Sequence, residues 1–422
     1  MPVATKDVLR LATVGSVDDG KSTLIGRLLV DTRLVADDHL DAVAAASERR
    51  GVGDLDLSFV TDGLRAEREQ GITIDVAYRY ATTPTRKLVI ADCPGHVQYT
   101  RNMATGSSTA DLALVAVDVA AGLKEQTRRH LVIAALLGVR ALIVAVNKMD
   151  TVEWSRAAYE RVVDDVGALA RVLGATSVVA VPVSALHGDN VVERSTRAPW
   201  YAGPTVLEAL EASDAGAWER SCGSRLPIQW VLRQGGGGRS YAGLVSGEAL
   251  RVGDAVTLLP AGIETSIRAI RYGGRALDEA AVGLAADVEL DHETDAGRGD
   301  LIATSPLPRV TRELEATVCW FGDDPLDLRG RRLRLKHTSR TTPVRVRALE
   351  GRIDVGSLEV TDADALATNE IGLVRLATAE PLVVDDYRED RVTGSFVLVD
   401  EATHATVAAG MVGRPPFVTV RR

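Results

Sequence analysis

Short apolar runs alternate with longer helical patterns over the first 210 or so residues, and this alternation restricts the fold more than any other feature of the chain. The first run, LRLATVG, is followed directly by the helical pattern KSTLIGRLL. The apolar runs are residues 9–15, 87–93, 112–119, 141–147 and 178–184. Strands that alternate with helices predict right-handed βαβ units, and continuously apolar strands predict a mostly parallel sheet covered on both faces.

The pattern changes near Leu226. Short strand-like runs separated by glycine or charged turns, such as LPIQWVL and TSIRAIRY, predict a compact β-barrel. A second series begins near Arg312 with ELEATVCWF and RRLRLKH, and we expect the boundary near Pro306 and Pro308. The glycines at 235–238 predict a loop between strands. The predicted domains are residues 1–222, 223–308 and 309–422.

The composition excludes several classes of protein. Of the 422 residues, 46% are hydrophobic and 25% are charged, which excludes a disordered chain, a collagen and a coiled coil. The formal net charge of −9 argues against wholesale binding of nucleic acid. Three cysteines are too few for a disulfide framework or a zinc site. No signal-peptide pattern and no apolar run of membrane-spanning length is present, so we expect a cytoplasmic protein without membrane contact.

A glycine-rich motif, GSVDDGKS, lies between the first predicted strand and the first predicted helix. It matches G-x-x-x-x-G-K-[ST], in which backbone N–H groups and the helix N-terminus face bound phosphates. Lys21 is expected to reach the β- and γ-phosphates, and the Ser22 hydroxyl is expected to bind Mg²⁺. The predicted phosphate loop consists of Gly15, Ser16, Val17, Asp18, Asp19, Gly20, Lys21, Ser22 and Thr23.

A second motif, DCPG, ends the predicted strand KLVIADC. The carboxylate of Asp92 can orient Mg²⁺ through a water molecule, and the Gly95 amide can contact a γ-phosphate. The pattern D-x-x-G is weak alone, but its place after a phosphate loop makes it informative. We therefore expect a phosphate-sensing segment made of Asp92, Cys93, Pro94, Gly95 and His96.

Two further motifs predict a guanine site. NKMD follows ALIVAV, and SAL follows VVAVPV, so both stand at the carboxyl ends of strands, where open α/β sheets bind ligands. Asp150 can accept from the guanine N1–H and 2-amino groups, whereas adenine would leave its charge unpaired. Asn147 would hold the base and the phosphate loop, the Lys148 stem would cover the ring, and a backbone N–H of the SAL loop would contact guanine O6. The predicted base-binding residues are Asn147, Lys148, Met149, Asp150, Ser184, Ala185 and Leu186.

Two residues are candidates for a switch. Thr73, in EREQGITIDV, can close over Mg²⁺ when a γ-phosphate is present; alternatively, it is a β-branched strand residue. His96 can position the attacking water between apolar gates at Val17 and Ile72; alternatively, it is a structural histidine at a helix start. The predicted catalytic residues are thus Lys21, Thr73, Asp92 and His96, with Ser22 and Thr73 as direct Mg²⁺ ligands.

With these motifs in order, the chain resembles the translation-factor class of GTPases, such as elongation factor Tu and the elongation factor 1-alpha type. Their fold, an α/β P-loop GTPase domain followed by two β-barrels, is the fold expected here. Within that class, VDDGKSTLIGRLL, PGHVQYTRNMATGSSTADLAL and QTRRH resemble the large GTPase subunit of bacterial sulfate adenylyltransferase. The similarity is close over residues 8–210 and looser afterwards.

The resemblance implies a heterodimer. This subunit would bind and hydrolyse GTP, while a smaller partner subunit would make adenosine 5′-phosphosulfate and pyrophosphate from ATP and sulfate. Hydrolysis would drive the synthesis, because the phosphate–sulfate anhydride is costly to form. The alternatives are a translation elongation-factor-like GTPase that carries aminoacyl-tRNA and a paralogue that serves a specialised pathway. QYTRNMATG and QTRRH favour the sulfate adenylyltransferase subunit, so we do not expect nucleic-acid binding.

The sequence departs from this family in three places. Cys93 stands where threonine is usual, Val97 replaces an acidic residue, and QGGGGRS at 234–240 is unusually rich in glycine. These changes bear on the mobility of the second switch and on partner contacts more than on nucleotide binding. No second G-x-x-x-x-G-K-[ST] motif follows, so we expect no adenylylsulfate kinase activity on this chain.

Two other features have simpler interpretations. Arg298–Gly299–Asp300 resembles an adhesion tripeptide but is expected to be a turn into the strand LIA. The basic stretch at 329–347 places Arg332, Arg334 and Lys336 on one face of a strand. We interpret that face as solvated, with contact to an acidic partner, or to RNA, as the alternatives.

Overall fold

The computed structural model describes residues 7–32, 75–96, 99–213, 222–233, 238–292, 294–326 and 331–420. Two compact units make up the chain, Met1–Ala217 and Trp218–Arg422. Thr73, Ile72 and Val97 lie outside the described residues, as does most of the glycine run at 235–238. Among the described helices, none has the length and hydropathy that crossing a membrane requires.

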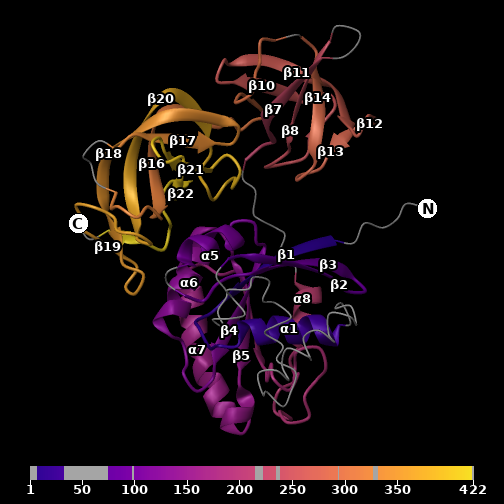
Figure 1. Cartoon of the computed structure of the whole chain (residues 1–422). Coiled ribbons are helices and arrows are strands. Elements are labelled where there is room, and N and C mark those ends of the chain that lie inside the picture. Colours follow the sequence, from indigo (N-terminus) through magenta and orange to yellow (C-terminus); the bar gives the residue numbers. More distant parts are fainter. Residues whose placement is uncertain are drawn as a thin grey trace. The chain divides into compact units, whose positions relative to one another are not determined.

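The first unit is built on a six-stranded sheet with the order β2-β3-β1-β4-β5-β6 (Figure 1). Only β2 is antiparallel to its neighbour, and the other pairs are parallel. The strands are β1 (Asp7–Val14), β2 (Ala77–Thr82), β3 (Arg86–Asp92), β4 (Leu112–Asp118), β5 (Ala141–Asn147) and β6 (Ser177–Pro182). The helices are α1 (Lys21–Asp31), α5 (Thr100–Ser107), α6 (Glu125–Leu136), α7 (Arg156–Val172) and α8 (Val206–Ala212), with the 3₁₀ turn η2 (Met149–Val152).

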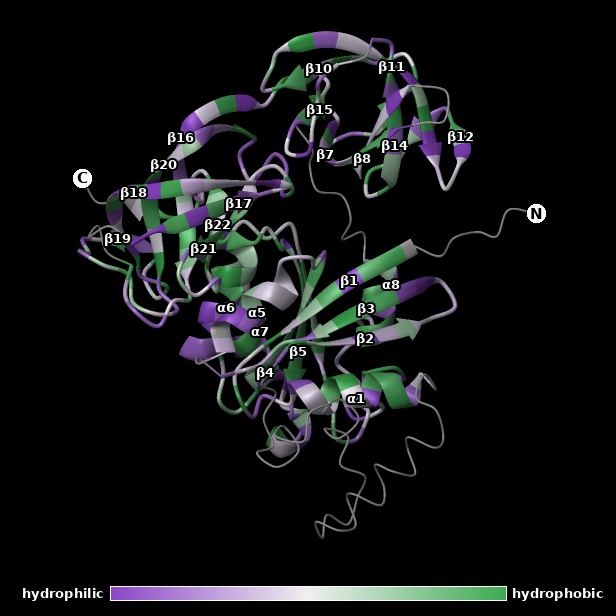
Figure 2. Ribbon diagram, turned by 45° about the horizontal axis from the view of Figure 1, so that its top comes forward, coloured by the Kyte–Doolittle hydropathy of each residue, from purple (hydrophilic) through white to green (hydrophobic). Residues whose placement is uncertain are grey.

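The apolar runs seen in the sequence form the core of this sheet. Every residue of β5 is buried, and β4 is buried except at its last residue. In Figure 2, β1 and β3 carry long hydrophobic stretches. Local signals fix the helix starts: Ser155 caps α7, and Thr205 forms a capping box with Glu208 at the start of α8. The predicted α/β domain with a mostly parallel sheet is confirmed.

The second unit contains two β-barrels with separate hydrophobic cores. The strands around the first core are β7 (Arg225–Arg233), β8 (Arg239–Leu244), β9 (Leu250–Arg251), β10 (Ala255–Leu259), β11 (Ile263–Tyr272), β12 (Arg275–Leu277), β13 (Glu279–Ala280), β14 (Ala285–Leu290) and β15 (Leu301–Ala303). Those around the second are β16 (Arg309–Trp320), β17 (Leu333–His337), β18 (Arg340–Ile353), β19 (Glu359–Thr361), β20 (Ile371–Val384), β21 (Ser395–Asp400), β22 (Thr406–Val412) and β23 (Thr419–Val420). Almost all pairings are antiparallel, and the two predicted barrels are therefore confirmed.

The basic stretch alternates as predicted. One face of β17 is buried in the second barrel and carries Leu333, Leu335 and His337. Arg332 and Lys336, on the other face, are exposed. The Arg298–Gly299–Asp300 tripeptide forms a turn directly before β15. Its Asp300 carboxylate accepts a hydrogen bond of 2.7 Å from Arg340 of β18, which links the two barrels.

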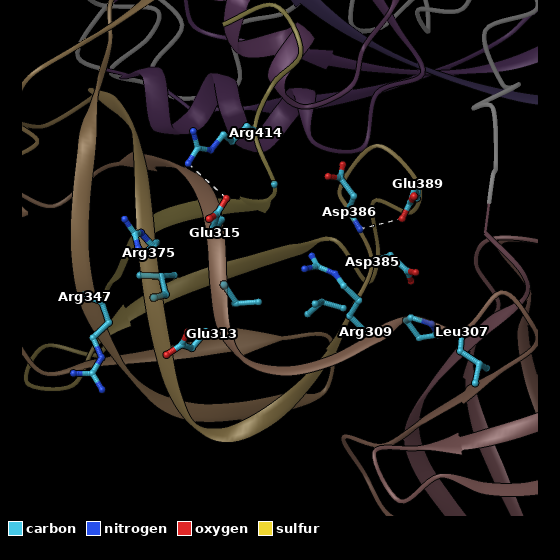
Figure 3. A pocket seen from close by; sticks show the side chains of 15 residues that line it. Leu307, Arg309, Glu313, Glu315, Arg347, Arg375, Asp385, Asp386, Glu389 and Arg414 are labelled. Atoms are coloured by element: carbon cyan, nitrogen blue, oxygen red, sulfur yellow. Dashed lines mark hydrogen bonds and ion pairs between the residues drawn. The ribbon is translucent and has the colours of Figure 1, made fainter. Parts of the chain in front are cut away.

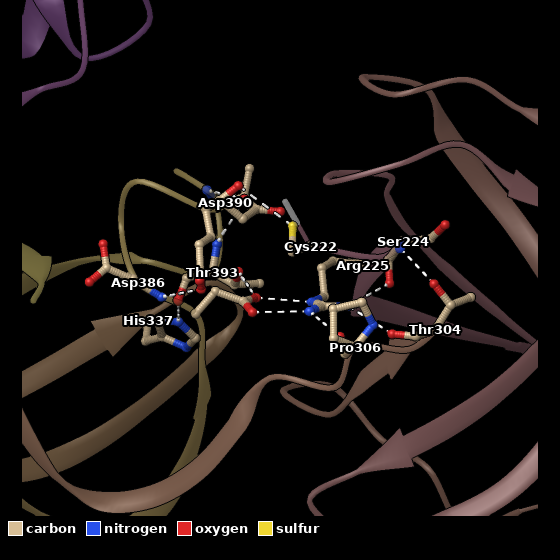
Figure 4. Close-up of polar contacts among 12 residues, drawn as sticks. Cys222, Ser224, Arg225, Thr304, Pro306, His337, Asp386, Asp390 and Thr393 are labelled. Carbon is tan, nitrogen blue, oxygen red and sulfur yellow. Dashed lines mark hydrogen bonds and ion pairs between the residues drawn. The ribbon is translucent and has the colours of Figure 1, made fainter. Parts of the chain in front are cut away.

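A buried ion pair also joins the two barrels (Figure 4). Arg225, at the start of β7, donates from Nε and Nη2 to the two carboxylate oxygens of Asp385, at 2.9 and 3.0 Å. The remaining guanidinium donors bind the Thr304 and Pro306 carbonyl oxygens, and Thr393 donates to Asp385 at 2.6 Å. Arg225 is 1% exposed, so the pair depends on these bonds to offset its lost hydration.

Candidate nucleotide-binding site

The predicted phosphate loop connects β1 to α1 in a conformation that needs its glycines. Gly20 has φ +84° and Asp18 has φ +65°, both in the left-handed region. A Cβ atom added at Gly95 would lie 2.5 Å from the Lys21 Nζ, so the DCPG segment passes directly over the lysine. Backbone in this conformation forms a concave surface of N–H groups that suits an anion. The loop therefore fits the diphosphate of a nucleotide.

Lys21 begins α1 and is 8% exposed. Its Nζ donates to the Ser16 carbonyl oxygen at 2.7 Å. Burial lowers the pKa of Lys21, while the nearby charges of Asp92 and Asp19 act in the opposite direction. A buried ammonium group at the base of the loop provides a positive charge where phosphate oxygens would lie.

Asp92 lies at the end of β3, on the strand next to the phosphate loop. Its Oδ1 accepts from the Thr13 hydroxyl at 3.1 Å, and the same hydroxyl accepts from the Cys93 backbone N–H. The Cys93 side chain is buried, with its Sγ 3.5 Å from the Ala91 carbonyl oxygen, and burial raises the pKa of its thiol to about 12. Cys93 thus supports the end of β3 as a small apolar side chain.

His96 is exposed at the edge of the site, with its ring 6.4 Å from that of Tyr99. Val17, predicted as one of its apolar gates, is half-buried in the phosphate loop. The other gate, Ile72, and the predicted switch residue Thr73 lie outside the described residues. The structure therefore places His96 next to the DCPG segment but does not describe the first switch.

Asn147 connects the phosphate loop to the base-binding loops. Its Nδ2 donates to the Asp19 carbonyl oxygen at 2.9 Å, and its Oδ1 accepts from the Ala185 N–H at 3.0 Å. Arg27 of α1, which the sequence analysis missed, donates from Nε to the Ala185 carbonyl oxygen at 3.2 Å. These bonds bring NKMD and SAL to the same edge of the sheet as the phosphate loop, as their positions after strands predicted.

The NKMD and SAL segments contain polar groups that have no partner among the described residues. Lys148 has φ +63°, and its Nζ forms an ion pair of 2.9 Å with Asp118. Asp150 is half-buried in η2 and makes no hydrogen bond or ion pair with any residue that the structure describes. The Ser184 hydroxyl is fully buried and has no hydrogen-bond partner among the described atoms. Such unused polar groups fit a ligand that brings its own donors.

A group of side chains on α6 also contacts the phosphate loop, and the sequence analysis did not assign it a role. Thr127 and Lys124 both bind the Asp19 carboxylate, and His130 binds the Gly15 carbonyl oxygen. In the sequence, the segment QTRRH indicates only a family resemblance. Nothing in its spacing indicates contact with a loop more than 100 residues earlier in the chain.

A large hollow lies elsewhere in the described part of the chain. It has a volume of about 1030 Å³ and lies on the second barrel of the second unit (Figure 3). Basic and acidic side chains line it together, and Arg414 pairs there with Glu315 at 3.5 Å. It contains none of the predicted site residues, so the candidate nucleotide site rests on motif geometry and not on cavity size.

Comparison with known proteins identifies the family. Residues 6–216 match the model of the elongation factor Tu GTP binding domain, and residues 313–413 match the GTP-eEF1A C-terminal domain-like model. Sulfate adenylyltransferase subunit 1 of Laribacter hongkongensis is 48% identical over 412 residues, which cover 97% of this chain and 85% of the relative. The chain belongs to the sulfate adenylyltransferase subunit 1 family.

Two further relatives support the assignment to the sulfate adenylyltransferase subunit 1 family. The bifunctional enzyme CysN/CysC of Mycobacterium tuberculosis (strain H37Rv) is 49% identical over 413 residues, covering 96% of this chain and 67% of that protein. Sulfate adenylyltransferase subunit 1 of Aeromonas hydrophila is 46% identical over 411 residues, which cover 96% of this chain and 86% of that protein. The chain thus carries a GTP-binding domain of this family, and the alternative of an aminoacyl-tRNA carrier is disfavoured.

Proposed function

We propose that this chain is the GTP-hydrolysing subunit of a sulfate adenylyltransferase. In this proposal, hydrolysis drives the synthesis of adenosine 5′-phosphosulfate and pyrophosphate from ATP and sulfate at a smaller partner subunit. One observation carries the guanine-nucleotide part: Asn147 ties the Asp19 backbone of the phosphate loop to Ala185 of the base loop. The names and 45–49% identity of the relatives support the sulfate part.

The residues at the phosphate end have distinct proposed roles. Lys21 neutralises the β- and γ-phosphates, and the Gly95 N–H contacts the γ-phosphate. The Ser22 hydroxyl and Thr73 would hold Mg²⁺ directly, and Asp92 would hold it through water. Ser22 fits this role because its half-buried hydroxyl, in the first turn of α1, makes no hydrogen bond within the described parts of the chain. When bound, Mg²⁺ would offset the charge that develops between the β- and γ-phosphates.

Asp150 is proposed to choose guanine over other bases. Replacement of Asp150 by asparagine should move the preference from GTP to xanthosine triphosphate by more than about 100-fold, because the new amide can donate to the xanthine 2-oxo group and no longer accepts two guanine donors. Competition between the two nucleotides in equilibrium binding measures the change. Unchanged preference for GTP in the variant would rule out this role, and Asp164→Asn, on the exposed face of α7, is the matched control.

His96 is proposed to position the attacking water, which its exposed place beside the DCPG segment allows. Replacement of His96 by alanine should slow GTP hydrolysis about 100-fold or more while GTP affinity changes little, because the contact forms only as the reaction proceeds. Single-turnover hydrolysis together with equilibrium binding separates the two quantities. A normal single-turnover rate would assign His96 to the alternative structural role.

A nucleotide can drive a second site only if the partner contacts differ between the GTP and GDP states. We propose that this difference lies in the Thr73 and His96 segments.

We also propose the boundaries 1–222, 223–308 and 309–422 for the three domains. The proposed location is the cytoplasm, where ATP, GTP and sulfate meet. The partner would be a small adenylyltransferase subunit, with no nucleic acid bound.

The test of the proposed function is product formation by this chain mixed with a small adenylyltransferase subunit. Adenosine 5′-phosphosulfate should accumulate from ATP and sulfate with GTP present, and far less of it should form with GDP. Equal product with GTP and GDP would show that hydrolysis does not drive the synthesis. Binding of aminoacyl-tRNA by the GTP-loaded chain, with no complex with the small subunit, would instead support the translation-factor alternative.

A further inference from the structure

The Asp19 carboxylate is the centre of a buried hydrogen-bond network behind the phosphate loop. Asp19 is 0% exposed. Its Oδ2 accepts from the Ser16 N–H at 2.8 Å and from the Thr127 hydroxyl at 3.2 Å, and its Oδ1 accepts from Lys124 Nζ at 2.7 Å. A buried carboxylate with three donors holds a defined position, because each lost bond leaves an unpaired charge in a poorly hydrated place.

Two of these donors come from α6. Thr127 donates to Asp19 and accepts a second hydrogen bond, of 3.1 Å, from the Ser16 N–H. Lys124, at the N-cap of α6, also donates to the Val17 carbonyl oxygen at 3.3 Å. The side chains of this first turn therefore contact both the Asp19 carboxylate and the backbone of the loop.

His130 adds a third contact to the loop backbone. Its Nδ1 lies 3.1 Å from the Gly15 carbonyl oxygen, which can only accept, so Nδ1 carries the proton. Its Nε2 lies 2.6 Å from the Gln126 amide nitrogen, which donates to it, so the imidazole is neutral. Burial lowers the pKa of His130 to about 3, and the neighbouring Lys21 charge acts in the same direction. The ring thus keeps this arrangement across the physiological pH range.

The network extends to the phosphate-binding groups. Ser16, whose N–H is held by Thr127 and Asp19, offers its carbonyl oxygen to Lys21 Nζ. Fixing the Ser16 peptide therefore also fixes the lysine. Lys124 has a second effect, because it neutralises the carboxylate of Asp19, a residue of the anion-binding loop, which would otherwise repel phosphate.

We propose that Lys124, at the N-cap of α6, and Thr127 and His130, within α6, are positioning residues of the nucleotide site. They fix the shape of the phosphate loop and so set its affinity for the diphosphate group of guanine nucleotides. This inference rests on the proposed GTP-binding function and assigns no contact between α6 and the nucleotide itself. It predicts that loosening α6 weakens the phosphate contacts and leaves the base contacts intact.

The test compares Thr127→Val with Thr127→Ser in the full chain. Valine keeps the size of the side chain and removes both hydrogen bonds, whereas serine keeps the hydroxyl. The valine variant should bind GDP about tenfold or more weakly, as the loss of one buried hydrogen bond or more predicts. Its affinity for GMP should change less than about twofold, since GMP makes no β-phosphate contact. Displacement of fluorescent GDP by a large excess of GMP measures this affinity. The serine variant should restore GDP binding.

Two further variants keep the test decisive if Thr127→Val folds poorly. Lys124 is one-third exposed, so Lys124→Met should fold, and it should weaken GDP binding through the uncompensated Asp19 charge. Glu125→Gln, which changes an exposed neighbour on α6, should bind GDP as the unaltered protein does. Two results would overturn this inference and leave the proposed function intact. One is a loss of GDP and GMP affinity in equal proportion, and the other is unchanged GDP binding in both Thr127→Val and Lys124→Met. Failure of the unaltered chain to bind either nucleotide would overturn the proposed function as well.

Discussion

Replacement of Lys21 by alanine should reduce the affinity of this chain for GTP by at least about 100-fold, the largest effect expected from a single change in the site. Lys21 is the buried cation that starts α1, and Gly95 passes directly over its Nζ. Without the ammonium group, the charge of the buried Asp92 carboxylate would act on the phosphates with no positive charge between them. Equilibrium titration with labelled GTP measures the loss.

The control for this change is Lys87→Ala, which removes an exposed lysine from β3 in the same unit. It should bind GTP as the unaltered protein does. The melting temperature of Lys21→Ala, measured without nucleotide, shows whether the fold is intact. Tight GTP binding by a folded Lys21→Ala protein would reject the phosphate-loop assignment.

Replacement of Arg225 by alanine should lower the free energy of unfolding of the second unit by about 3–5 kcal/mol. The variant leaves Asp385, which is 5% exposed, as an unpaired charge, and it removes the donors to the Thr304 and Pro306 carbonyl oxygens. Denaturant unfolding of the full chain, followed by tryptophan fluorescence, measures the change because Trp230 and Trp320 lie in this unit.

Two comparisons isolate the contribution of burial. Arg251 and Glu279 form an exposed pair of 2.7 Å in the same unit, and Arg251→Ala should change stability by less than about 1 kcal/mol. The double change Arg225→Met with Asp385→Leu should recover much of the loss, since apolar side chains need no partner. If Arg225→Ala and Arg251→Ala lower the free energy of unfolding equally, burial of the Arg225–Asp385 pair does not stabilise the contact between the barrels.

The sequence predicts that the four motifs meet, because each motif adjoins a strand. In a mostly parallel sheet, the residues after β1, β3, β5 and β6 must meet at one edge, so GSVDDGKS, DCPG, NKMD and SAL come together once the strands are recognised. The change near Leu226, from alternating strands and helices to short strand-like runs, predicts the two barrels. It does not predict the order and register of their strands.

Contacts between distant segments escape this reasoning. Thr127 and Asp19 are 108 positions apart, and Arg225 and Asp385 are 160 apart, so no local pattern pairs them. Within the SAL loop, which is expected to supply a backbone N–H to guanine O6, the Ala185 N–H is bound to Asn147 Oδ1. Such pairings depend on how the chain packs in three dimensions, and periodicity along the sequence does not contain that information.

The most direct measurement is GTP hydrolysis by this chain mixed with a small adenylyltransferase subunit, with and without ATP plus sulfate. If hydrolysis drives adenylyl transfer, the two substrates together should stimulate it, and adenosine 5′-phosphosulfate should form in step with phosphate release. Omission of sulfate alone should abolish the stimulation. Hydrolysis at the same rate with and without the substrates, and no complex between the two proteins, would contradict the proposed coupling.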